Sequence, residues 1–89
     1  MAAPVTGTFA ATGNSPAIVG KQIAIDMTFA GVATVNIQWL VDGTNWRTIT
    51  DGTFTASAQK IVEAPGIPIR LNCSAYTADV TYAMSVAGL

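Results

Sequence analysis

The sequence predicts an all-β fold: a single antiparallel β-sandwich or β-barrel of about seven short strands. Apolar residues alternate with polar or small residues along most of the chain, as in strands that bury one face. Gly, Pro, Asn and Asp cluster between the alternating runs, and no run keeps the 3.6-residue period of a helix. Thr, Val and Ile, which strands prefer, are abundant.

The alternation locates the individual strands. Within residues 34–41, for example, Val35, Ile37 and Trp39 fall on one face, while polar or small residues fall mostly on the other. Three other runs repeat this pattern, and three weaker runs complete the set. The predicted strands are residues 5–11, 22–29, 34–41, 46–50, 57–63, 69–76 and 80–86.

Turn residues separate these runs. Ala30-Gly31 predicts a short hairpin between the strands at 22–29 and 34–41. Asp42-Gly43-Thr44-Asn45 predicts a turn that leads into the strand at 46–50. Further turns or breaks are expected at Asp51-Gly52, residues 65–68 and residues 77–79.

The first part of the chain is less regular than the rest. Residues 12–20, which include Gly13-Asn14-Ser15-Pro16, predict a loop. Residues 1–20 are therefore either an N-terminal arm that orders on binding or an edge strand of the sheet. In both cases residues 1–89 form a single β domain, because a chain of this length holds one core.

Composition predicts association with other chains. A domain of 89 residues is marginally stable without a disulfide, a metal or a partner. One cysteine allows no intrachain disulfide, and the absence of histidine leaves no usual zinc ligand set. Only 10% of the residues are charged, against about 25% in an average domain. We therefore expect partner chains to cover part of the surface.

Several classes of partner are excluded by the same composition. Four basic residues and a net charge of −1 leave no basic surface for nucleic acid. No apolar run approaches the roughly 18 residues of a membrane-spanning helix. Residues 1–4 lack the basic and then apolar order of a signal peptide, so we expect synthesis in a cytoplasm, with a reduced thiol.

We expect no enzymatic activity, no catalytic residues, no metal and no cofactor. The absence of histidine removes the commonest general base. Cys73 is predicted to point inward between Leu71 and Ala75, as an inert buried thiol. Three of the five carboxylates, those of Asp42, Asp51 and Asp79, fall at turns where Asp bonds the local backbone.

The aromatic residues suggest where a partner binds. Trp39 lies on the apolar face of its strand and is predicted to be core. Trp46 follows a turn and has Arg47 beside it, and these two residue types are enriched at interface hot spots. A third aromatic falls on the polar face of the strand at 69–76. The predicted interface residues are Asp42, Gly43, Trp46, Arg47 and Tyr76.

Two runs resemble the small β-sandwich virion proteins of tailed bacteriophages. Residues 37–46, Ile-Gln-Trp-Leu-Val-Asp-Gly-Thr-Asn-Trp, are similar to their "strand, Asp-Gly turn, Trp" element. Residues 68–77, followed by Val80-Thr81-Tyr82, are similar to the hairpin that closes their fold. The resemblance covers about residues 22–86, most of the chain.

The resemblance implies a capsid decoration, or cement, protein made in the host cytoplasm and located on the virion surface. It implies a homotrimer that binds the major capsid protein and stabilises the capsid. A tail, baseplate or head-fibre component is an alternative role. A carbohydrate-binding β-sandwich is a second alternative, for which exposed aromatic side chains are required.

Overall fold

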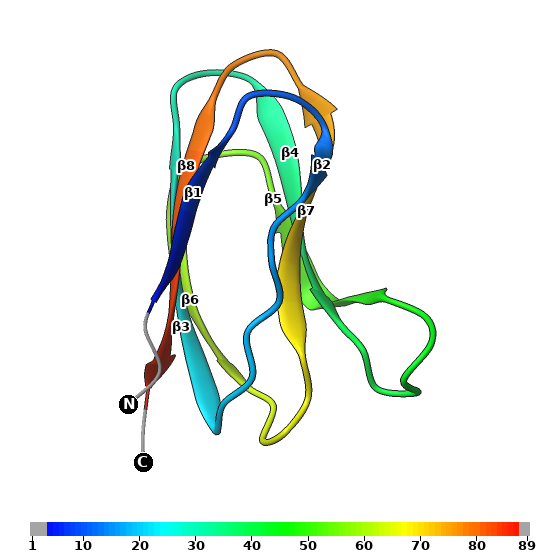
Figure 1. Ribbon diagram of the computed structural model, residues 1–89. Coiled ribbons are helices and arrows are strands. Elements are labelled where there is room, and N and C mark those ends of the chain that lie inside the picture. Colours follow the sequence, from blue (N-terminus) through cyan, green and yellow to red (C-terminus); the bar gives the residue numbers. More distant parts are fainter. Residues whose placement is uncertain (1–3, 88–89) are drawn as a thin grey trace.

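The computed structural model describes residues 4–87 and confirms the all-β prediction, as a sandwich of two antiparallel sheets (Figure 1). The first sheet has the strand order β1-β8-β3-β6, and the second has the order β2-β7-β4-β5. The strands are β1 (Val5–Phe9), β2 (Gly13–Asn14), β3 (Gln22–Phe29), β4 (Ala33–Trp39), β5 (Arg47–Phe54), β6 (Ala58–Glu63), β7 (Ile69–Tyr76) and β8 (Val80–Ala87).

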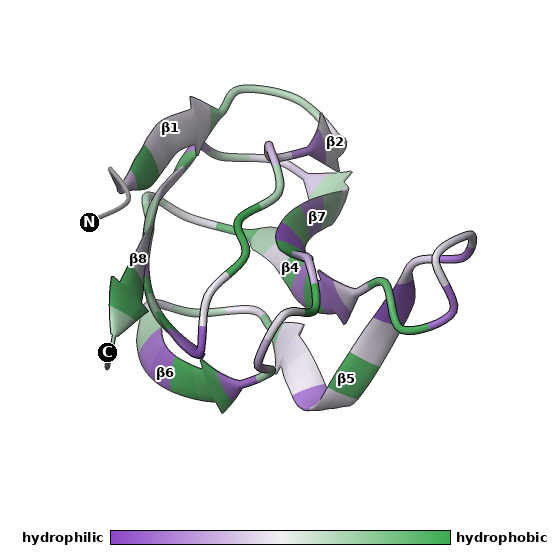
Figure 2. Ribbon diagram, turned by 60° about the horizontal axis from the view of Figure 1, so that its bottom comes forward, coloured by the Kyte–Doolittle hydropathy of each residue, from purple (hydrophilic) through white to green (hydrophobic). Residues whose placement is uncertain are grey.

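The core lies between the two sheets, and alternate residues of each strand enter it. Figure 2 shows this alternation as green and purple bands along β7. Because each sheet has one apolar face, the sheets bury those faces against each other. The largest fully buried side chains are Ile23, Met27, Ile37, Ile69, Leu71, Met84, Val35, Val80 and Cys73.

The chain changes sheet at every connection but one between the described strands. Only β4 and β5 are consecutive and paired, through the loop of residues 40–46. The hairpin predicted at Ala30-Gly31 is wrong, because β3 and β4 lie in different sheets. The closing hairpin implied by the resemblance is also absent, since β7 and β8 belong to opposite sheets. Alternation marks the buried face of a strand but does not identify its neighbour.

A large β-bulge interrupts β5. Asn36 pairs with Thr53 and Gln38 pairs with Thr48, so residues 49–52 all lie opposite Ile37. Asp51, within the bulge, has a φ of 58°, a left-handed conformation that Asp tolerates better than most residues. The turn predicted at Asp51-Gly52 therefore does not end the strand, which continues to Phe54.

A second bulge reverses the end of β7. Thr34 pairs with Ala75 whereas Val35 pairs with Cys73, so Ser74 is the extra residue. Beyond it the alternation changes face. Ala75, predicted to be inward, is exposed, and the next residue, predicted to be on the polar face, packs against the core.

The N-terminal part of the chain supplies one edge to each sheet. β1 is an edge strand that pairs with β8. The predicted loop at 12–20 instead contains β2, and two backbone bonds of 2.8 Å continue its pairing, from Ser15 N to Leu71 O and from Ile18 N to Ile69 O. Residues 1–3 of the predicted arm lie outside the described residues.

Candidate association surface

The loop of residues 40–46 projects from the end of the second sheet (Figure 1). Asp42 closes it: Oδ1 accepts the backbone N–H groups of Thr44 at 2.8 Å and Asn45 at 2.7 Å, and Oδ2 accepts Asn45 Nδ2 at 3.1 Å. These bonds lower the pKa of Asp42 from 3.8 to about 2, because they favour the carboxylate. The bond from the Asn45 backbone N–H has the largest effect. Gly43 has a φ of 80°, which glycine adopts without strain.

At the base of the loop, Trp46 stacks on an arginine from another strand. The Cζ atom of Arg70, in β7, lies 4.4 Å from the centre of the Trp46 ring, within the range of a cation–π contact. Arg70 Nε also donates to Gln38 Oε1 at 2.9 Å. The guanidinium is therefore held from two sides, and it fixes the half-exposed indole at the foot of the projecting loop.

Beside this stack, the outer face of the second sheet carries an uncharged ladder of side chains. Asn72 Nδ2 donates to Asn14 Oδ1 at 2.7 Å, and Thr53 Oγ1 donates to Asn36 Oδ1 at 2.7 Å. Asn36 Nδ2 connects these two pairs, since it donates to Asn72 Oδ1 at 3.3 Å and to Ser74 Oγ at 3.1 Å. The ladder crosses all four strands of the sheet and orders its polar groups without any charge.

Four of the five predicted interface residues lie together. Asp42 and Gly43 are in the loop, and Trp46 and Arg47 follow at its junction with β5. Tyr76 lies at the far end of β7, where it pairs with Ala33 and its hydroxyl donates to Asp79 Oδ1.

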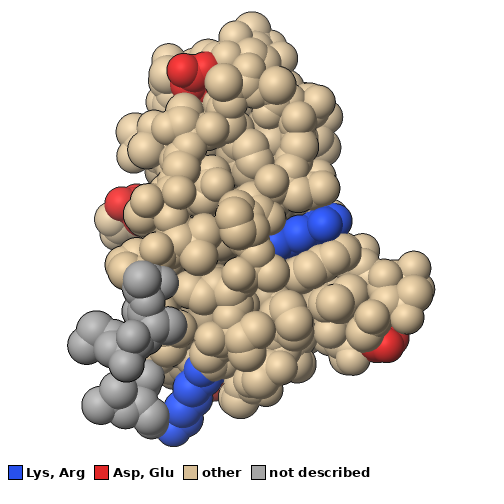
Figure 3. Space-filling view, viewed as in Figure 1, with Lys and Arg blue, Asp and Glu red and all other residues tan. Residues whose placement is uncertain are grey.

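Gln38 and Arg70, which the sequence did not reveal, complete this surface, and the ladder lies beside it. We call the loop of residues 40–46 together with Gln38, Arg47 and Arg70 the loop surface. Figure 3 shows a basic side chain where the loop meets the body of the molecule, on a view that is otherwise poor in charge.

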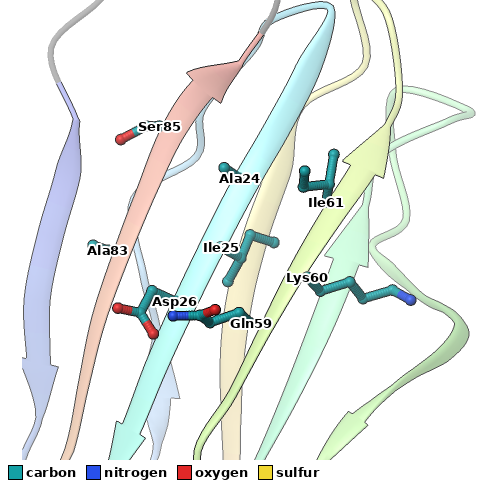
Figure 4. A pocket seen from close by; sticks show the side chains of 8 residues that line it. All are labelled: Ala24, Ile25, Asp26, Gln59, Lys60, Ile61, Ala83 and Ser85. Atoms are coloured by element: carbon teal, nitrogen blue, oxygen red, sulfur yellow. The ribbon is translucent and has the colours of Figure 1, made fainter.

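A separate shallow hollow of about 510 Å³ lies on the outer face of the first sheet (Figure 4). Asp26 is the only acidic residue that lines it, beside Gln59 and Lys60. Ala24 and the exposed Ile61 make its floor and rim largely apolar. Asp26 and Lys60 are the titratable residues among those that line the hollow.

Residues 4–87 hold one cysteine, which lies in the core. Cys73 is buried, and its burial raises the pKa of the thiol, which lowers its reactivity. Within this range no group of three His, Cys, Asp or Glu residues is placed to hold a metal ion. No helix of the described chain is long and apolar enough to span a bilayer.

Comparison with protein-family models, curated proteins and solved structures gave no match for this chain.

Proposed function

We propose that this chain is a structural protein of a bacteriophage virion, which decorates the outer capsid surface as an oligomer and stabilises it. The loop surface is the part that contacts the major capsid protein. The observation that carries the proposal is the Trp46–Arg70 stack at the foot of a projecting loop, beside a sheet face that is polar but uncharged. The phage context comes from the resemblance of residues 22–86.

The low charge of the molecule supports a role within an assembly. Nine charged side chains are spread over a solvent-accessible surface of 4881 Å². Interface centres are depleted of charge and enriched in aromatic residues and Arg. Trp46, Arg47 and Arg70 supply such a centre, and the Asn and Thr side chains of the ladder supply hydrogen-bonding groups around it.

The mechanism is mechanical. Each copy buries a modest area against the capsid, and the projecting loop fits between neighbouring capsid subunits. Because an oligomer makes several such contacts at once, dissociation of one contact leaves the others in place, and retention exceeds the affinity of a single site. The capsid then resists outward pressure through bridges between its subunits.

The stack favours this role over carbohydrate binding. A sugar-binding platform needs free aromatic faces, and the guanidinium of Arg70 leaves at most one face of the Trp46 ring free. Tyr76, the other aromatic among the predicted interface residues, packs against the core at the opposite end of β7.

The test is binding to heads that the encoding phage assembles without this gene. Purified chain is mixed with these heads, the heads are sedimented, and the bound chain is measured over a concentration series. Saturable binding is expected, and Trp46→Ala should weaken it roughly 30-fold, since truncation of a buried hot-spot residue costs about 2 kcal/mol or more. Decorated heads should also release their DNA at a higher temperature.

Val32→Ala is the matched control. Val32 is 73% exposed in the connection between β3 and β4, at the end of the sandwich opposite to the loop, so its truncation should leave head binding unchanged. Equal binding by the Trp46→Ala and Val32→Ala variants would contradict the assignment of the loop surface. Absence of the wild-type chain from the sedimented heads would contradict the proposed function itself.

A further inference from the structure

Three of the four sheet edges carry features that prevent pairing with another strand. β5 has the bulge of residues 49–52. β6 carries Lys60 in its middle, on the same face as the buried Val62. β2 has only two residues, and Pro16, which has no backbone N–H, follows shortly after it. Bulges, inward-pointing charges, short strands and proline are the usual protections of an exposed edge.

β1 carries none of these protections within its five residues, although Pro4 directly precedes it and lies outside the residues that would pair. It pairs with β8 in an unbroken register from Val5–Met84 to Phe9–Val80, and it contains no charge and no proline. It is the outermost strand of its sheet, and no other strand of residues 4–87 pairs with its free edge. Its free backbone groups are therefore open to a further strand.

The sequence of β1 indicates which strand this is. Val5-Thr6-Gly7-Thr8-Phe9 has the same pattern in both directions: apolar, Thr, Gly, Thr, apolar. An antiparallel copy related by a two-fold axis at Gly7 would pair Gly with Gly, each Thr with a Thr, and Val with Phe. Thr–Thr and aromatic–β-branched pairs are among the favourable cross-strand pairs. A strand that is its own complement fits a second copy of the same chain.

The side chains around Gly7 leave the free edge of β1 unobstructed. A side chain at this position has no room on the inner face, where its Cβ would lie 2.6 Å from the Tyr82 hydroxyl. Tyr82 of the same chain thus accounts for the glycine at this position. The exposed Thr6 and Thr8 point outward on either side of it, so no large side chain obstructs the free edge at the axis.

We propose that β1 pairs with β1 of a second copy about a two-fold axis at Gly7, which joins the two first sheets into one eight-stranded antiparallel sheet. Five paired residues a side make an interface smaller than the roughly 1,200 Å² of a standard complex, so the solution dimer is weak. The contact gives even-numbered assemblies and is distinct from the trimer implied by the resemblance. It does not depend on the phage role.

Paired charges at positions 6 and 8 test the register. In the proposed dimer, position 6 of each copy faces position 8 of the other, so the two positions meet at two places. The double variant Thr6→Lys/Thr8→Lys therefore places like charges opposite each other, whereas Thr6→Lys/Thr8→Glu places opposite charges there. Both variants change the same two exposed threonines, and urea unfolding of each at low chain concentration confirms that it folds. The mass of each chain is measured by light scattering up to millimolar concentration, at low ionic strength.

The wild-type chain should dimerise. The dissociation constant of the lysine–glutamate variant should be equal or lower, and that of the lysine–lysine variant should be on the order of tenfold higher or more. A wild-type chain that stays monomeric throughout overturns the proposal, as does an oligomer whose mass is the same in all three proteins. Head binding depends on the loop surface, so its failure would leave the β1 dimer intact and can be distinguished from failure of this proposal.

Discussion

Removal of the Ser15 hydroxyl should destabilise the protein far more than its small size suggests. Ser15 is the one buried polar residue of the described core, with 7% of its surface exposed. Its Oγ accepts the backbone N–H of Leu71 at 2.8 Å and donates to Pro16 O at 3.0 Å, while its own N–H donates to Leu71 O. The side chain thus replaces a backbone acceptor at the point where β2 ends.

The Ser15→Ala variant leaves the N–H of Leu71 buried without a partner. Such a group costs about 1–3 kcal/mol, against a total stability of roughly 4–13 kcal/mol for a domain of this length. The free energy of unfolding should therefore fall by about 1–3 kcal/mol, and the melting temperature by roughly 4–24 °C. Urea unfolding followed by tryptophan fluorescence measures the change, at a fixed chain concentration because association would alter it.

Ser74→Ala is the control with the same chemical change. Ser74 is exposed, and its Oγ accepts only the amide of Asn36 at 3.1 Å, a bond that water can replace. This variant should lose no more than about 0.5 kcal/mol. If the two serine variants unfold at the same urea concentration, the argument that Ser15 completes the edge of the second sheet is refuted.

Three further predictions concern the core, the loop and the thiol. Ile37→Ala should lower the free energy of unfolding by about 2–5 kcal/mol in urea, since Ile37 is fully buried between the sheets. The turn at Asp42 should be stable at neutral pH, weaken as the pH falls below the ordinary value of 3.8, and be lost as the pH passes the folded pKa of about 2. The amide NMR shifts of Thr44 and Asn45 should report that transition, and an unchanged shift would contradict it. Cys73 should react with a thiol reagent only after unfolding, because it is buried and its pKa is raised.

The sequence predicted four residues of the loop surface but not the side chains from other strands that complete it. Asp42, Gly43, Trp46 and Arg47 are close in sequence, so a turn and an adjacent aromatic were enough to find them. Arg70 stacks on Trp46, and Gln38 accepts a hydrogen bond from Arg70 because β7 and β4 pair in one register. That register is set by contacts between segments far apart in the chain, and alternation alone does not contain it.

Tyr76 shows how one local irregularity changes a prediction. Strict alternation from Ile69 places Tyr76 on the outer face, the same face as Arg70. The extra residue at Ser74 shifts the pairing with β4 and turns Tyr76 toward the core, next to Ala33. A bulge adds one residue to one strand only, and its position depends on the partner strand, which the sequence of β7 does not reveal.

The sequence by itself determined the all-β class, the positions of the longer strands, the inward placement of Cys73 and the scarcity of charge, because each follows from composition or from a period of two. The tertiary structure decided which strands share a sheet, where the two bulges lie, and that β1 is left with an open edge. The physical reason is that the residues of one strand determine which of its faces is buried, whereas the choice of neighbouring strand depends on the residues of two strands. Consecutive strands with matching apolar faces can pair side by side or face each other across the core, and both arrangements bury the same residues.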